Sequence, residues 1–306
     1  MELAMKKDIL YSLGQAPSGE LVHIADAEPN RSYLCPSCQQ PFVQHRGSRK
    51  RPHFAHKVLS PNCTPETALH HGFKTLLFEK IQRHLVEGKP LPIAWDCPKC
   101  EGSHAGNLLK KAVSVAVEHS LGERQPDITL FDEHQRPVAA IEVVVSHAPE
   151  EEALAFYDAN RIAVVTFKLT SDQDIHQLDA DGLKPDTVSV CPNPRCSRCG
   201  EPMPKKRLLI IEGKCWKCNA PMKVAAIQGD MGYEPDFSPS DAKLAAQHGV
   251  FMKTQYSKII RESYIANTCR RCNKFVGGHY LFTEYVATDY PRLELDAGYY
   301  CPDCQI

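Results

Sequence analysis

Residues 138–145 read Val-Ala-Ala-Ile-Glu-Val-Val-Val, an apolar run with one acidic residue, Glu142, in its middle. A continuous run of this kind, rich in β-branched residues, predicts a strand that is covered on both faces of a sheet. Burying an ionised carboxylate costs about several kcal/mol unless the group is paired or bound to a metal ion. Glu142 therefore requires a partner, which the neighbouring segments have to supply.

The segments around this strand predict a helix, three strands, a second helix and a fourth strand. The first helix begins at Thr64-Pro65, because threonine is a good N-cap and proline suits the first helical position, and it runs to about Val86. The other elements are expected at residues 112–118, 127–131, 138–145, 149–157 and 162–169. This order predicts an α/β (α+β) domain over residues 64–170.

Further acidic residues lie on the elements that flank Glu142. Asp127 begins the second predicted strand, and Glu66 lies on the first helix in a stripe with His70 and Lys74. Carboxylate oxygens are the preferred ligands of Mg²⁺ and Mn²⁺. Glu66, Asp127 and Glu142 are thus the predicted ligands of such an ion, although a solvent-exposed helix face would carry the same stripe.

Together these motifs resemble the PD-(D/E)XK nuclease core and, more specifically, the competence protein CoiA-like family. The resemblance covers residues 1–170 and rests on Tyr33-Leu-Cys35-Pro-Ser-Cys38, His53-Phe-Ala-His56, Glu66-x3-His70-x3-Lys74, Glu118, Pro126-Asp127 and Ile141-Glu-Val-Val-Val-Ser146. It implies a restriction-endonuclease-like fold (αβββαβ) and metal-dependent cleavage of DNA. It also implies that Glu118 assists the metal ligands, and that Lys74 or His70 lies near the attacking water or the phosphate.

Position 144 departs from the nuclease motif. The motif has a lysine two residues after the glutamate, and CoiA-like proteins often have glutamine there, whereas this chain has Val144. Valine cannot orient or deprotonate a water molecule. Three alternatives remain open: Lys74 replaces the missing lysine, the metal ion alone activates the water, or the fold has lost cleavage and only binds nucleic acid.

Twelve of the fourteen cysteines form six Cys-x-x-Cys pairs, a spacing that suits a tetrahedral zinc ion. In the C-terminal third this spacing predicts two zinc ribbons, Cys196, Cys199, Cys215 and Cys218 in the first, and Cys269, Cys272, Cys301 and Cys304 in the second. Apolar runs at residues 208–211 and 279–286 are expected to form a short hairpin in each. Four thiolates leave no open coordination position, so these sites are predicted to be structural.

Two further predicted zinc sites combine cysteine with histidine. In the N-terminal one, five candidates compete for four places; we favour Cys35, Cys38, His56 and Cys63, with His53 as the alternate ligand. In the other, the set is Cys97, Cys100, His104 and Cys191. The alternative for this last set is a knuckle that binds no metal, so three or four zinc ions are expected.

The overall composition favours a cytoplasmic protein. No apolar run approaches the ~18 residues of a membrane span, and the N-terminus lacks the apolar stretch of a signal peptide. A reducing compartment favours metal-bound thiolates over disulfides. The net charge of -1 does not indicate nucleic-acid binding by itself. One loop, however, gathers four basic residues that either contact phosphates or are simply solvated: Arg46, Arg49, Lys50 and Arg51.

The favoured function is therefore a metal-dependent nuclease with DNA as its partner. The alternatives are a nucleic-acid-binding protein on a degenerate nuclease scaffold and a protein-interaction adaptor that uses its zinc ribbons. The predicted organisation is a zinc module (residues 1–63), a nuclease-like core (64–170, with an insertion at 90–108), a linker (171–190), a first ribbon (191–227), and a helix with a second ribbon (228–306).

Overall fold

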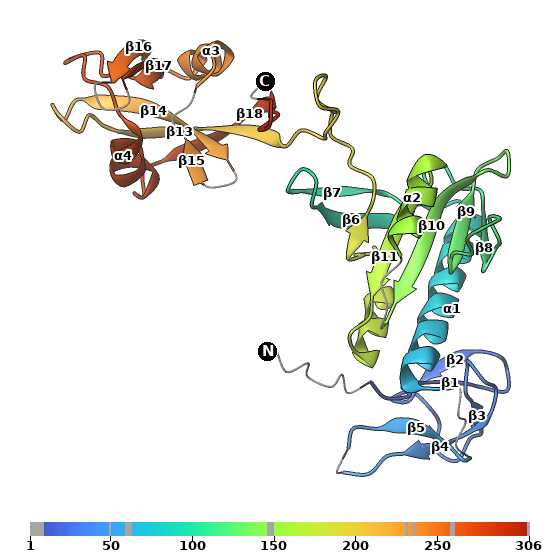
Figure 1. Cartoon of the computed structure of the whole chain (residues 1–306). Coiled ribbons are helices and arrows are strands. Elements are labelled where there is room, and N and C mark those ends of the chain that lie inside the picture. Colours follow the sequence, from blue (N-terminus) through green and yellow to red (C-terminus); the bar gives the residue numbers. More distant parts are fainter. Residues whose placement is uncertain are drawn as a thin grey trace. The chain divides into compact units, whose positions relative to one another are not determined.

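The computed structural model describes residues 9–48, 50–58, 63–145, 150–229, 232–234, 237–257 and 261–304. The chain divides into two compact units, the first formed by Met1–Cys97 and Ser103–Val190 and the second by Pro98–Gly102 and Cys191–Ile306. Both contain helices and small sheets, so the fold is mixed α/β (Figure 1). No helix in the described part of the chain has the length and hydrophobicity needed to cross a membrane.

The first unit begins with a small antiparallel sheet in the order β2-β1-β3-β4-β5. Its strands are β1 (Leu13–Gln15), β2 (Leu21–His23), β3 (Tyr33–Leu34), β4 (Pro41–His45) and β5 (His53–His56). Phe42 and Phe54 are buried and stack with ring centroids 5.4 Å apart. This N-terminal module therefore has an aromatic core of its own, from which β5 presents its histidines.

Helix α1 (Pro65–Val86) begins at the predicted residue, since Thr64 is the N-cap and its hydroxyl accepts the N–H of Thr67 at 3.2 Å. Its buried stripe repeats every four residues at Leu69, Phe73, Leu77 and Ile81. Gly72 lets the N-terminal module approach closely, because a Cβ there would lie 2.5 Å from a methyl carbon of Leu13. The helix thus joins the small sheet to the larger one.

The larger sheet of the first unit has the order β12-β11-β10-β9-β8. The strands are β8 (Ser114–Val117), β9 (Ile128–Phe131), β10 (Pro137–Val144), β11 (Ala163–Lys168) and β12 (Thr187–Val188). Strands β8, β9 and β10 pair antiparallel, whereas β10 and β11 are parallel and are joined through helix α2 (Glu151–Ala159). The predicted order of one helix, three strands, one helix and one strand is therefore the observed order.

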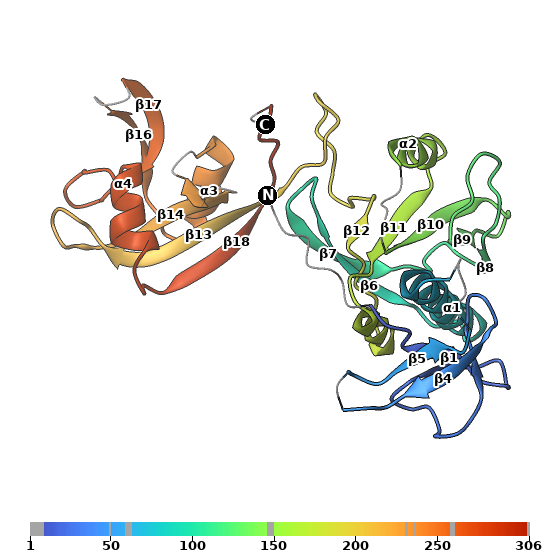
Figure 2. The ribbon, with the colours of Figure 1, turned by 60° about the horizontal axis from the view of Figure 1, so that its bottom comes forward.

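The two helices cover opposite faces of this sheet (Figure 2). Tyr157 of α2 belongs to one cluster with Ala140 and Val164. On the other face, the ring centroids of Phe73 in α1 and Phe167 in β11 lie 5.4 Å apart. Side chains of a strand alternate between faces, so an apolar run without alternation is what a sheet covered on both sides requires.

Residues 170–190 are more ordered than the linker expected there. They contain the 3₁₀ helix η1 (Asp172–Asp179), which Ser171 and Asp174 cap reciprocally, and β12, which pairs with β11. The polar composition of this segment predicted a linker. A short capped turn and an edge strand, however, can form with few apolar residues. The insertion before β8 is a two-stranded sheet of β6 (Pro92–Cys97) and β7 (Gly102–Asn107).

The second unit is built on a sheet in the order β15-β14-β13-β18. Its antiparallel strands are β13 (Lys205–Lys214), β14 (Pro221–Gly229), β15 (Gly232–Glu234) and β18 (Arg292–Tyr299). Helix α3 (Pro239–Gln247) and the hairpin of β16 (Met252–Ser257) and β17 (Glu262–Asn267) complete this part. Leu208 and Ile210 point into one core and Leu209 and Ile211 into another, so β13 is buried on both faces.

The strand predicted at residues 279–286 is wrong. This segment forms α4 (Gly278–Leu281) and the π-helical turn η2 (Phe282–Val286). Leu281 and Tyr285, four residues apart, are 1% and 0% exposed, and they pack in the core that contains Leu209 and Ile211. Aromatic and β-branched residues favour strands only weakly, and burial of one helical face against the sheet overrides that preference.

Candidate functional site

Four groups of cysteine and histidine residues bring their ligand atoms within 4.8 Å of one another. They are Cys35, Cys38, His56 and Cys63; Cys97, Cys100, His104 and Cys191; Cys196, Cys199, Cys301 and Cys304; and Cys215, Cys218, Cys269 and Cys272. Two of the Sγ–Sγ distances are 3.5 Å for Cys35–Cys63 and 3.8 Å for Cys218–Cys269. Sulfurs about 2.3 Å from a central zinc ion lie about 3.8 Å apart in a tetrahedron. These groups could therefore hold zinc ions.

The N-terminal group contains His56 and leaves out His53. His56 Nε2 lies 3.1 Å from Cys38 Sγ. His53 and His56 are three residues apart on β5, so they face opposite sides of the strand. His53 instead places Nδ1 3.0 Å from the carbonyl oxygen of Arg51 and stacks on His45 at 5.1 Å. The alternation of side chains along β5 therefore makes His56, and not His53, the candidate ligand.

The two C-terminal groups pair their knuckles differently from the predicted ribbons. The first knuckle (Cys196, Cys199) meets the last (Cys301, Cys304), and the second (Cys215, Cys218) meets the third (Cys269, Cys272). We call these groups the Cys196 cluster and the Cys215 cluster. The predicted pairing of consecutive knuckles is therefore wrong in the structure, although the eight ligands are the same.

Strand β13 explains this exchange. It follows the first knuckle, runs for ten residues and ends immediately before Cys215. Ten residues of strand span about 33 Å, so the knuckles at its two ends cannot share an ion. Strand β18 pairs antiparallel with β13, with Tyr299 opposite Lys205, and it returns the chain to the beginning of β13 just before Cys301. Sheet pairing, rather than sequence distance, decides which cysteines meet.

A second kind of site surrounds Asp127, the residue before β9. Its Oδ2 lies 3.1 Å from His70 Nε2 and accepts the backbone N–H of Val143 at 2.8 Å. The ammonium group of Lys74 lies 3.5 Å from Asp127 Oδ1 and also forms an ion pair with Glu118. The Lys74 side chain is only 4% exposed. A buried cation from α1 is thus held between two carboxylates at the end of the sheet.

Glu142 completes this site from the neighbouring strand. Ile141 pairs with Ile128, so continuing the antiparallel register by one residue brings Glu142 opposite Asp127. Glu142 Oε1 accepts a hydrogen bond from the hydroxyl of Tyr157 at 2.7 Å. Glu142 is only partly buried, and this contact supplies the partner that the sequence required for it. Asp127, Glu142, Lys74, His70, Glu118 and Tyr157 are called the Asp127 site below.

The two strand carboxylates have different electrostatic environments. Burial raises the pKa of Glu142, and the negative charge of Asp127 adds to this effect, whereas the hydrogen bond from Tyr157 opposes it. Burial also acts to raise the pKa of Asp127, but the contacts with His70, the Val143 N–H and Lys74 outweigh it and lower the pKa. Neighbouring titratable groups whose pKa values move apart are typical of catalytic sites.

Other predicted members of this site contribute less. Within the described ranges, the only sets of three or more Cys, His, Asp or Glu ligands this close together are the four cysteine-rich groups. Glu66, Asp127 and Glu142 therefore do not form a compact three-carboxylate group. Val144 is buried, with 8% of its surface exposed, and its apolar side chain offers no polar group to the site.

The basic loop is partly occupied by internal contacts. The guanidinium of Arg46 donates to the carbonyl oxygens of Ile24 and Ala27 at 2.7 and 2.5 Å. Arg51 pairs at 2.6 Å with the carboxylate of Asp172, which is 2% exposed. Lys50 is exposed, and Arg49 lies outside the described residues. Two of the four cations thus stabilise the first unit itself.

Tyr157 is the member of the Asp127 site that the sequence did not reveal, and its role can be tested with Tyr157→Phe. The variant should raise the pKa of Glu142 further, because the hydroxyl stabilises the ionised carboxylate. It should also destabilise the first unit by about 1–2 kcal/mol. Carboxyl-carbon NMR titration and urea unfolding measure the two effects. Tyr256→Phe, at a 58% exposed position, is the control and should change neither.

Comparison with known proteins supports the N-terminal part of this description. The family model of competence protein CoiA, N-terminal domain, matches residues 20–65. The matched segment holds β2 to β5 and the candidate zinc ligands Cys35, Cys38, His56 and Cys63, and it is a small part of the 306-residue chain. No match to a curated protein or to a solved structure was found.

Proposed function

We propose that this protein is a metal-dependent nuclease that hydrolyses phosphodiester bonds of DNA with the Asp127 site. The contact of the buried Lys74 with Asp127 carries the proposal, since it puts a cation beside the strand carboxylates although position 144 lacks one. The order α1-β8-β9-β10-α2-β11 agrees with the αβββαβ core of PD-(D/E)XK nucleases. The similarity of residues 20–65 to the CoiA N-terminal domain favours a competence-related role in DNA processing.

Asp127 and Glu142 are the groups that would hold Mg²⁺ or Mn²⁺. Their oxygen donors suit either ion, because carboxylate oxygens are the ligands that Mg²⁺ and Mn²⁺ prefer. Glu66 lies one helical turn before His70 on α1, but it forms no compact ligand group with these two carboxylates. Such an ion, when bound, neutralises charge on the phosphate and lowers the pKa of bound water.

The other residues of the Asp127 site position the reactants. Lys74 pairs with Asp127 and Glu118, and since an ammonium group has three donors, the remaining one would hold the attacking water or a phosphate oxygen. Glu118 holds the ammonium group from the far side. Asp127 fixes the ring of His70 through Nε2, so that Nδ1 is available to accept a proton from water.

Incubation of labelled single-stranded, duplex and branched DNA with Mg²⁺ or Mn²⁺ tests this function. Wild-type protein should cleave at least one substrate only when a divalent ion is present. Lys74→Gln should lower the cleavage rate by about 10²-fold, because the amide removes the positive charge and is one atom shorter than the lysine side chain. The double variant Lys74→Gln/Val144→Lys has a lysine at the motif position again, and it should recover part of the cleavage rate.

Lys110→Gln is the matched control, since it removes one exposed lysine of the same unit that belongs neither to the Asp127 site nor to the basic loop, and it should cleave at the wild-type rate. Cleavage by Lys74→Gln at the wild-type rate would remove Lys74 from the mechanism. A wild-type protein that cleaves no substrate with either ion would overturn the proposal.

Binding of nucleic acid without cleavage is the second candidate function. The burial of Val144 favours it, since a nuclease core that has lost its motif lysine has room for an apolar side chain there. In that case Lys74 and Glu118 would serve only to neutralise the buried Asp127. Unchanged DNA affinity in Lys74→Gln together with no cleavage by wild type would establish this alternative.

A further inference from the structure

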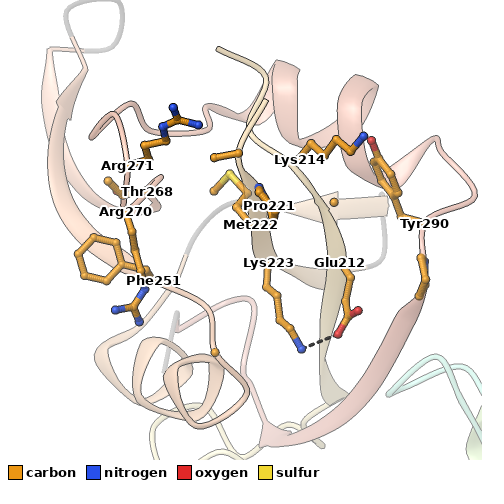
Figure 3. A pocket seen from close by; sticks show the side chains of 14 residues that line it. Glu212, Lys214, Pro221, Met222, Lys223, Phe251, Thr268, Arg270, Arg271 and Tyr290 are labelled. Atoms are coloured by element: carbon orange, nitrogen blue, oxygen red, sulfur yellow. Dashed lines mark ion pairs between the residues drawn. The ribbon is translucent and has the colours of Figure 1, made fainter. Parts of the chain in front are cut away.

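A cavity of about 540 Å³ lies beside the Cys215 cluster in the second unit (Figure 3). This volume lies within the range of about 300–1,000 Å³ that is typical of ligand sites. Its walls come from the end of β13, the beginning of β14, Phe251, the Cys269 knuckle and the segment before β18. They carry one carboxylate, Glu212, and four cations: Lys214, Lys223, Arg270 and Arg271.

Most of this positive charge is not neutralised by the protein. Lys223 pairs with Glu212 at 2.5 Å, as the dashed line in Figure 3 shows. Within the described residues, no carboxylate lies at ion-pair distance from Lys214, Arg270 or Arg271, and all three are exposed. A cavity with three unpaired cations, in a chain whose net charge is -1, favours an anionic ligand.

The three consecutive cations at the start of β13 differ from those around the cavity. Each has an acidic partner: Lys205 pairs with Asp296 at 2.8 Å, Lys206 with Asp241 at 2.6 Å and Arg207 with Glu294 at 2.6 Å. The cations at this end of β13 are therefore neutralised, whereas Lys214, Arg270 and Arg271 around the cavity have no ion pair within the described residues.

Two features of the cavity fix its cations in place. Arg270 and Arg271 are the two residues between Cys269 and Cys272, so a metal-bound Cys215 cluster would hold their backbone. The guanidinium carbon of Arg270 lies 4.6 Å from the centroid of the Phe251 ring, and Lys253 Nζ lies 5.0 Å from it. Cation–π contacts of this kind hold a side chain in one orientation, which reduces the entropy lost on binding.

Apolar surface lies between the cations. Pro221, Met222 and Tyr290 line the cavity, with Lys214 and Tyr290 on the wall opposite Arg270 and Phe251 (Figure 3). Phosphates need cations, whereas an unstacked base needs a flat or apolar surface. We infer that this cavity binds a phosphate together with an unstacked base of single-stranded DNA. The site is separate from the Asp127 site, so it requires no cleavage activity.

Fluorescence anisotropy with labelled oligothymidylate of about 20 nucleotides tests the inference on the full-length chain, without added divalent ions, from about 50 to about 200 mM salt. Arg270→Ala/Arg271→Ala should weaken binding about tenfold or more and reduce the slope of log K against log salt by about 0.7, for the one phosphate that the two arginines contact. Both substitutions keep the backbone N–H groups of the knuckle. Phe251→Leu should weaken binding as well, because Arg270 then loses its platform.

Three comparisons decide the outcome. Lys205→Ala/Arg207→Ala removes two paired cations from the same sheet and should leave affinity and slope unchanged. Arg270→Lys/Arg271→Lys keeps the charge and should restore the slope, and zinc content must equal that of wild type in every variant. A duplex of the same length and a free thymidine nucleotide should bind more weakly than the single strand. Unchanged binding by the alanine pair, equal loss in the Lys205/Arg207 pair, or tighter binding of duplex would each overturn the inference.

Discussion

Replacing Asp127 and Glu142 together by alanine is expected to reduce divalent-dependent DNA cleavage by at least about 10³-fold. Each carboxylate belongs to the set that would hold the ion, and members of one catalytic group act together, so the double variant should be little slower than the worse single one. Initial rates on the substrate that wild type cleaves best, measured with Mg²⁺ and Mn²⁺, give the comparison. Activity that remains at the wild-type rate in pure double variant would belong to a contaminant.

A second double variant, which replaces the two carboxylates by neutral amides, tests the same residues with less change in side-chain size. Asp127→Asn/Glu142→Gln keeps the size of both side chains and should also be inactive, since neutral amides are poor ligands for Mg²⁺. Glu150→Ala/Glu152→Ala is the matched control, because it removes two carboxylates that are 77% and 85% exposed, at the N-cap and in the first turn of α2. Control activity should equal that of wild type. Equal losses of activity in the control and in the Asp127/Glu142 pair would mean that the total negative charge of the unit, and not the Asp127 site, determines the cleavage rate.

The sequence predicted the Asp127 site to different degrees for different residues. Helical periodicity placed Lys74 and His70 on one stripe, and the structure brings both to Asp127. Glu66 shares that stripe but lies a turn farther along, and periodicity does not show how far a stripe reaches. Tyr157 could not be predicted, because its contact with Glu142 depends on how α2 crosses the sheet after β10. Local patterns define faces of elements, whereas contacts between elements depend on packing.

The C-terminal unit shows the same limit more clearly. Spacing identified all eight cysteines of the Cys196 and Cys215 clusters, because the geometry of a Cys-x-x-Cys turn is local. It could not identify which turns meet, since that depends on β18 pairing with β13 across about 80 residues of chain. The apolar run at residues 208–211 indicated a strand, but not that the strand extends to Lys214 and separates the knuckles.

Zinc stoichiometry distinguishes the two pairings, and the expected change is large. Cys196→Ser/Cys301→Ser removes two ligands of the Cys196 cluster and should lower the zinc content by one ion per chain. Cys196→Ser/Cys215→Ser removes one ligand from each cluster and should lower it by two. Pairing of consecutive knuckles would reverse these results, because Cys196 and Cys215 would then share an ion. Zinc content by mass spectrometry of the native protein gives both numbers directly.

The single variant Cys196→Ser is the necessary control, because it must lose one ion for either double variant to be interpretable. We expect this result, since the two clusters lie at opposite ends of β13 and the sheet between them has apolar cores on both faces. A structural zinc contributes apparent folding free energy of about 10 kcal/mol or more, so loss of the ion should unfold the segment around each cluster. Limited proteolysis should then cut near the first and last knuckles in Cys196→Ser, and leave the Cys269 knuckle protected. Cleavage at all four knuckles would show that the second unit unfolds as a whole. Proteolysis would then not identify which knuckles share a zinc ion, and a direct measurement of the cysteines bound to each ion would be needed.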